Sequence, residues 1–133
     1  MPEQRPASRR KTVRSNDQDQ LAQLGRLQPQ AVELEKAVLG ACIIEQDAFA
    51  TVSDFLKPHS FYDSKHQVIF QAIQSLAAAN SPVDLLTVNE QLQKSGDLEQ
   101  AGGAAYVAEL SRSMLSSAHL EYHARIVAQK ALA

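Results

Sequence analysis

From Pro29 onward, apolar residues recur at spacings of three and four along almost the whole chain. This periodicity constrains the fold more than any other feature, because it places apolar side chains on one face of an α-helix. No run of alternating β-branched residues between turn signals interrupts it. A half-buried β-strand requires a period of two, so the sequence predicts an all-α fold.

The pattern divides into about six helices, separated by residues that cap or end a helix. Asp47, Asp63 or Ser64, and Asp84 are candidate N-caps, and Gly96 supplies a left-handed residue at a helix end. The expected helices span about 31–44, 47–57, 63–79, 84–95, 103–113 and 117–133, the last capped by Ser116 or Ser117. Only a few residues separate the last two helices, so we expect them to form an antiparallel helical hairpin.

The first 28 residues contain few apolar side chains and much of the positive charge. Residues 1–16 hold five Lys or Arg against one Glu, a net of +4. Residues 30–133 hold seven Lys or Arg against twelve Asp or Glu, a net of −5. A segment so poor in apolar surface does not offset the entropy of ordering. We therefore expect a disordered tail over residues 1–28 and one acidic domain over residues 29–133.

The composition and the C-terminal end of the chain limit the class of protein to which it can belong. A length of 133 residues, 44% hydrophobic and 21% charged, suits one soluble domain. There is neither an apolar run of about eighteen residues nor a secretory leader, which predicts a cytoplasmic protein without a membrane partner. The last predicted helix stays amphipathic up to Ala133 without a stop signal. We expect this domain to be cut from a longer protein inside that helix.

No catalytic, cofactor or metal site is expected in these residues. None of the five glycines is followed by the Lys-Ser or Lys-Thr of a phosphate-binding loop. His119 and His123 lie four residues apart but lack an evident third ligand. We interpret His66 as a hydrogen-bonded core or boundary histidine, and Glu35 as a carboxylate that suits the positive end of a helix dipole. Cys42, the lone cysteine, is expected to be a small buried hydrophobe.

Six segments in register resemble the amino-terminal domain of bacterial DnaB-type replicative helicases. The similarity extends from Pro29 to the end of the chain. The segments that carry it are 29–40, 56–70 (with Leu-Lys-Pro, Phe-Tyr and His-x-x-Ile-Phe), 82–88, 96–99, 102–110 and 122–127.

The resemblance implies that the longer protein is a ring-shaped, hexameric, ATP-driven helicase that separates DNA strands at the replication fork. Its ATP and Mg²⁺ would bind to a C-terminal ATPase domain absent from this chain, which would also contact the DNA. In such helicases the amino-terminal domains pair through helical hairpins into a collar. The implied partners of this chain are therefore a second copy of itself, the C-terminal domain of primase, and a helicase loader.

The predicted hairpin supplies the candidate residues for protein–protein contact. They are Tyr106, Glu109, Leu110, Leu120, Tyr122, His123 and Ile126. The alternative is that several of them simply hold the two hairpin helices together, since helix stripes are more often core than interface. Two other functions stay open: a nucleic-acid-binding module that acts through the basic tail, and a small helical enzyme.

Overall fold

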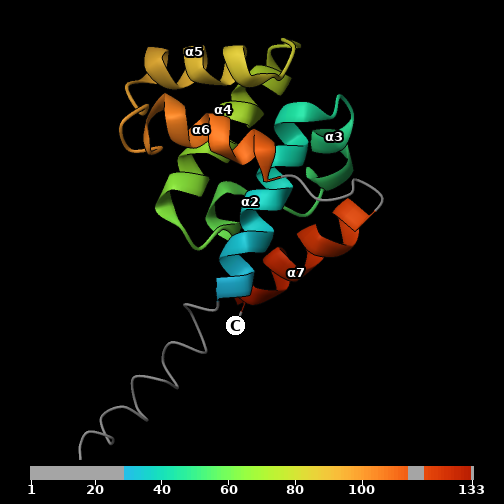
Figure 1. Cartoon of the computed structure of the whole chain (residues 1–133). Helices are drawn as coiled ribbons and strands as arrows, with labels where there is room; N and C mark the ends of the chain where they lie inside the picture. Colours follow the sequence, from blue (N-terminus) through green and yellow to red (C-terminus); the bar gives the residue numbers. More distant parts are fainter. Residues whose placement is uncertain (1–28, 114–118, 133) are drawn as a thin grey trace, which may run out of the picture.

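The computed structural model describes residues 29–113 and 119–132, and no strand occurs within them. These two ranges contain six α-helices and one short 3₁₀ helix (Figure 1). They are α2 (Pro29–Ile44), α3 (Ala48–Val52), η2 (Pro58–Ser60), α4 (Ser64–Ala78), α5 (Leu85–Ser95), α6 (Gly103–Arg112) and α7 (Leu120–Leu132). The predicted all-α class is confirmed for this part of the chain. The expected tail at 1–28 and the caps at Ser116 or Ser117 lie outside the described residues.

Helix α2 is the central element of the domain. It packs against α4, α6 and α7, and Figure 1 shows it in the middle of the other helices. Its residues Val38, Leu39 and Cys42 are at most 1% exposed. Apolar side chains on nearly every side of a helix favour burial from several directions. This explains why α2 packs against several helices at once.

The predicted antiparallel hairpin of the last two helices is wrong. Helix α7 packs mainly on α2, and α6 packs on α2 and α5. In Figure 1, α2 lies between α6 and α7. The physical reason is that α2 offers each of them a broad apolar face, which outweighs the preference of consecutive helices for one another. Leu110 of α6 and Leu120 of α7 both belong to the common core.

Local signals set most of the helix ends as predicted. The Asp63 side chain accepts a hydrogen bond from the Lys65 backbone N–H at 2.9 Å and caps α4. Asp84 and Thr87 form a reciprocal capping box at the start of α5. Gly96 ends α5 with a left-handed φ of +80°. Asp47 stands at the N-cap of α3 without a side-chain cap bond, and α3 ends at Val52, earlier than expected.

The core is continuous and combines aliphatic side chains with a small aromatic cluster. Phe61 and Phe70 are buried with ring centroids 5.0 Å apart, and Phe49 lies 5.6 Å from Phe70. Cys42 is buried as predicted, and burial raises the pKa of its thiol to about 12. The thiol therefore stays protonated and unreactive near neutral pH. Within residues 29–113 and 119–132, no helix has the length and apolar character needed to cross a membrane.

Candidate interaction surface

The three candidates on α6 have different surroundings. Leu110 is fully buried in the domain's own core. The Tyr106 ring is half-buried, and its hydroxyl lies 2.6 Å from His66 Nε2. The Glu109 side chain is exposed, with its carboxylate 3.4 Å from Lys36 Nζ on α2. Two of the three therefore contribute to internal contacts, and Glu109 is the α6 candidate that faces solvent.

The four candidates on α7 separate into an inner and an outer group. Leu120 is 6% exposed and packs in the core. Tyr122 is 67% exposed, which makes it one of four large apolar side chains exposed in the described part of the chain. His123 and Ile126 are half-buried, and the His123 ring centroid is 5.6 Å from that of Tyr122. We call Tyr122, His123 and Ile126 the α7 outer patch.

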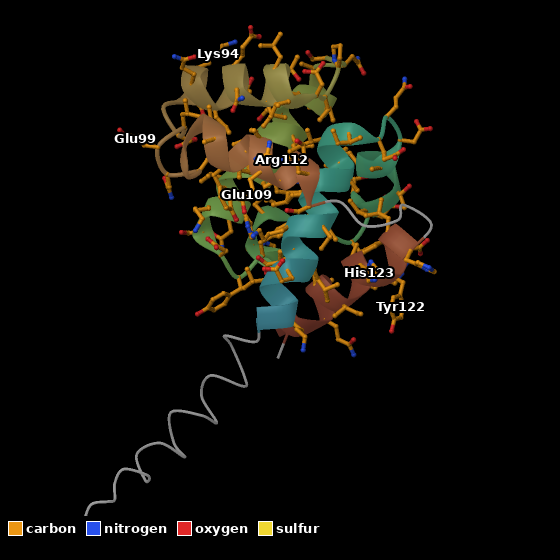
Figure 2. All side chains as sticks on the ribbon, viewed as in Figure 1. Lys94, Glu99, Glu109, Arg112, Tyr122 and His123 are labelled. Atoms are coloured by element: carbon orange, nitrogen blue, oxygen red, sulfur yellow. The ribbon has the colours of Figure 1, made fainter. Side chains whose placement is uncertain are left out.

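The seven candidates do not form one continuous surface. Figure 2 shows Glu109 and Arg112 on α6, well separated from Tyr122 and His123 on α7. The separation follows from the position of α2 between the two helices. What the structure brings together on a solvent-facing helix is the α7 outer patch alone.

A contact outside the core joins α7 to the segment that follows α3. The guanidinium carbon of Arg125 lies 4.2 Å from the centroid of the Phe55 ring, in the segment that follows α3. Within α7 itself, Nε and Nη2 of Arg125 both donate to Oε2 of Glu121, at 3.0 Å and 2.9 Å. A cation over an aromatic face holds both groups in a defined geometry. The outer patch is thus presented by a helix anchored on α2 and on the loop after α3.

A buried polar cluster was missed by the sequence reasoning. Glu35 of α2 is 3% exposed, and its Oε1 atom lies 2.7 Å from Nδ1 of His66, which is fully buried. His66 is the hydrogen-bonded core histidine that was predicted, whereas Glu35 was interpreted only through the helix dipole. A signal was present: Glu35 precedes the buried residues Val38, Leu39 and Cys42 by three, four and seven positions. That spacing places it on the buried stripe of α2.

Electrostatics around this cluster perturb two ionisable groups. Burial acts to raise the pKa of Asp63, but the hydrogen bond from the Lys65 backbone and the neighbouring His66 outweigh it and lower the pKa. Burial, and then the carboxylates of Asp63 and Glu109, raise the pKa of Tyr106 to about 12. Tyr106 therefore keeps its phenolic proton near neutral pH, whereas an activated nucleophile has a lowered pKa and gives its proton up. These perturbations belong to a structural network.

His119, just before α7, and His123 on α7 do not make a metal site by themselves. The ring centroids of His119 and His123 are 6.1 Å apart. Among residues 29–113 and 119–132, no group of three or more His, Cys, Asp or Glu side chains is arranged to hold a metal ion. A structural metal site needs four ligands, of which a pair supplies only half.

Comparison with protein families gives one match over most of the chain. The model of the DnaB-like helicase N terminal domain matches residues 27–129. The replicative DNA helicase DnaB of Rhodothermus marinus is 54% identical over 110 residues, which are 83% of this chain and 12% of that protein. The DnaB of Geobacillus stearothermophilus is 42% identical over 107 residues, 80% of this chain and 24% of that protein. The chain thus spans a quarter or less of the length of these relatives.

Solved structures have the same fold. The crystal structure of the N-terminal domain of DnaB helicase from Mycobacterium tuberculosis superposes with a TM-score of 0.72 at 38% identity, covering 75% of this chain and 72% of that one. A second similar structure is a DnaB-like replicative helicase, described with its interactions with primase. Its TM-score is 0.66 at 27% identity, over 74% of this chain and 23% of that one.

Proposed function

Because this chain belongs to the family of DnaB-like helicase N-terminal domains, we propose that it is the protein-interaction and oligomerisation domain of a replicative DNA helicase. The family match over residues 27–129 carries this proposal, since those residues include almost the whole described domain. ATP-dependent separation of DNA strands is then an activity of the longer protein. In our proposal ATP, Mg²⁺ and DNA bind to a C-terminal ATPase domain.

The proposed partners are a second copy of this domain, the C-terminal domain of primase, and a helicase loader. A similar solved helicase is described together with its interactions with primase, which supports the second partner. The α7 outer patch supports a protein contact in general. Tyr122 combines apolar area with a polar tip, a combination common at interface hot spots.

The charge of the domain supports protein partners over nucleic acid. Residues 30–133 carry a net charge of −5, with seven basic against twelve acidic side chains. Binding to DNA depends on neutralising phosphates with Lys and Arg, and an acidic body repels them instead. Several of its basic groups are also paired with carboxylates, as in Lys36 with Glu109 and Arg125 with Glu121.

Sedimentation velocity over a concentration series tests self-association through α7. We expect the sedimentation coefficient of the wild-type chain to rise with concentration. Tyr122→Ala should weaken the association about tenfold, which corresponds to about 1.4 kcal/mol. Leu86→Ala is the matched control, because Leu86 is 66% exposed on α5, a different helix. It should associate like the wild type.

Two results would contradict this proposal. One is a wild-type chain that stays monomeric at every concentration reached. The other is an equal loss of association in Tyr122→Ala and Leu86→Ala, which would mean that any exposed apolar side chain contributes and that α7 has no special role. Far-UV circular dichroism of both variants establishes that each retains the helical fold.

A further inference from the structure

Helix α7 is attached to the rest of the domain along one side. Its buried side chains are Leu120, Ala124 and Val127, which are at most 6% exposed and recur at spacings of four and three. Apolar side chains at this spacing form a single stripe on a helix. We call these three residues the α7 seam, along which α7 packs on its neighbours α2, α3 and η2.

Tyr122 of the outer patch lies on the side of α7 away from the seam. It precedes Ala124 by two residues, which places it about 200° around the helix, almost directly opposite. A helix with its side chains is about 10 Å across, so a roll of about 10° about the seam would move this side by about 2 Å. Interface residues must be held to within about 0.5 Å or 10–20°. The roll of α7 about its seam therefore decides where Tyr122 is presented.

Arg125 lies on the flank of α7, between the seam and the outer side. It follows Ala124 by one residue, about 100° around the helix. Its Nε and Nη2 atoms donate to Glu121 Oε2, one turn earlier, at 3.0 Å and 2.9 Å. Its guanidinium carbon lies over the Phe55 ring, 4.2 Å from the ring centroid. A planar guanidinium can donate hydrogen bonds from its edge and stack on an aromatic ring with its face.

Phe55 gives this contact a base outside α7. It lies in the segment between α3 and η2, where its side chain is partly buried and packs against the core. Arg125 is thus held to its own helix by Glu121 and rests on a ring that belongs to the body of the domain. Because the contact is off the seam, it opposes a roll of α7 that the seam alone permits.

We propose that Arg125 is the positioning residue of the α7 outer patch. Stacked on Phe55, it keeps α7 at the roll at which Tyr122 meets a partner protein, and it acts through this orientation without touching the partner. As in the proposed function, on which this inference rests, α7 presents the contact surface. The Arg125 side chain is 61% exposed, so its contacts contribute little to stability and its variants should fold.

Residual dipolar couplings of the backbone N–H bonds, measured by NMR on the full chain in a dilute aligning medium, test the orientation directly. They report how α7 is oriented relative to α2, α4 and α6. We expect the wild-type couplings to fit one rigid body, and the α7 couplings to deviate from it in both Arg125→Gln and Phe55→Leu. Phe55→Leu keeps an apolar side chain against the core but removes the aromatic face. If either variant leaves the α7 couplings unchanged, the proposal is overturned.

Lys65→Gln is the matched control. Lys65 Nζ lies 5.1 Å from the centroid of the Tyr106 ring, so this variant removes a contact of the same kind between α4 and α6. We expect its α7 couplings to equal those of the wild type. A deviation as large as that of Arg125→Gln would also count against the proposal, because the effect would then not be specific to the flank of α7.

Sedimentation equilibrium of the same variants tests the consequence for self-association. A contact between an exposed cation and an aromatic face shifts an equilibrium by about two- to fivefold, so Arg125→Gln and Phe55→Leu should each weaken association by about that factor. The double variant should be no weaker than either single variant, because both remove the same contact. A loss confined to Arg125→Gln, or two losses that multiply, would show that Arg125 touches the partner itself and would refute the positioning role.

The two measurements separate a failure of this inference from a failure of the proposed function. A wild-type chain that does not associate contradicts the proposed self-association, whereas the dipolar couplings still decide whether Arg125 orients α7. Far-UV circular dichroism establishes that each variant keeps its helical content.

Discussion

Tyr106 illustrates how the surroundings of one side chain produce a pH dependence. Burial and nearby carboxylates raise the pKa of its phenol from 10.0 to about 12. The folded state thus holds this proton more tightly than the unfolded state, so the stabilisation is complete below about pH 10 and is lost as the pH rises toward 12. For a half-exposed ring screened by solvent, the loss is about 1 kcal/mol.

We expect the Tyr106 titration to appear in the tyrosinate absorbance. The wild-type titration minus that of Tyr106→Phe should have a midpoint near pH 12, because the difference isolates one phenol. A midpoint near 10, the ordinary value for tyrosine, would show that the phenol is neither desolvated nor near carboxylates.

Leu110 and Leu86 distinguish core from surface among the leucines. Leu110 lies on α6, and its side chain is fully buried in the core. Leu110→Ala therefore removes packed methyl groups and leaves a cavity. We expect a loss of about 2–5 kcal/mol in the free energy of unfolding, measured by urea denaturation. Leu86→Ala, at a site 66% exposed, should change it by about 0.5 kcal/mol or less. Equal losses in the two variants would mean that α6 does not pack as described.

At the scale of elements, the N-caps of α5 and α3 make a matched pair. Asp84 accepts from the Thr87 backbone N–H at 2.8 Å, and the Thr87 hydroxyl accepts from the Asp84 N–H at 2.8 Å. Asp84→Ala should therefore cost about 1 kcal/mol in chemical denaturation. Asp47 has no side-chain cap bond, so Asp47→Ala should cost clearly less. A larger loss at Asp47 would contradict the capping geometry.

Gly102 and Gly103, at the N-cap and the first residue of α6, allow a similar comparison. Both residues have positive φ, at +97° and +88°, where a side chain is strained by about 1–2 kcal/mol. A Cβ at Gly102 would lie 3.0 Å from the side chains of Lys65 and Tyr106, whereas one at Gly103 would meet nothing within 4 Å. We expect Gly102→Ala to lower the melting temperature more than Gly103→Ala. The reverse order would contradict the close approach of Tyr106 to the turn.

The elements were more predictable from sequence than their packing. Apolar spacing located the helices, and Asp63, Asp84 and Gly96 are local signals that act within a few residues. The position of α2 between α6 and α7 depends on how much apolar area each pair of helices can bury, which is a property of the tertiary structure. The short connection suggested a hairpin, but the all-round apolar surface of α2 decided the arrangement.

At the scale of the whole molecule, the candidate surface was also less predictable from the sequence than the helices that carry it. Tyr122, Leu110 and Leu120 were all candidates because they belong to the predicted hairpin. Tyr122 is exposed, whereas Leu110 and Leu120 are buried in the core of the domain. An apolar stripe alone does not tell a core face from a contact face. The Glu35–His66 contact joins residues 31 positions apart and required the folded structure to be recognised.

The central claim is that this domain works by binding other proteins, with α7 presenting the contact. Calorimetric titration of the chain with the C-terminal domain of primase tests it most directly, with Tyr122→Ala and Leu86→Ala in parallel. We predict saturable binding that Tyr122→Ala weakens and Leu86→Ala leaves unchanged. Absence of binding by the folded wild-type chain up to its solubility limit, or equal binding by all three proteins, would contradict the account.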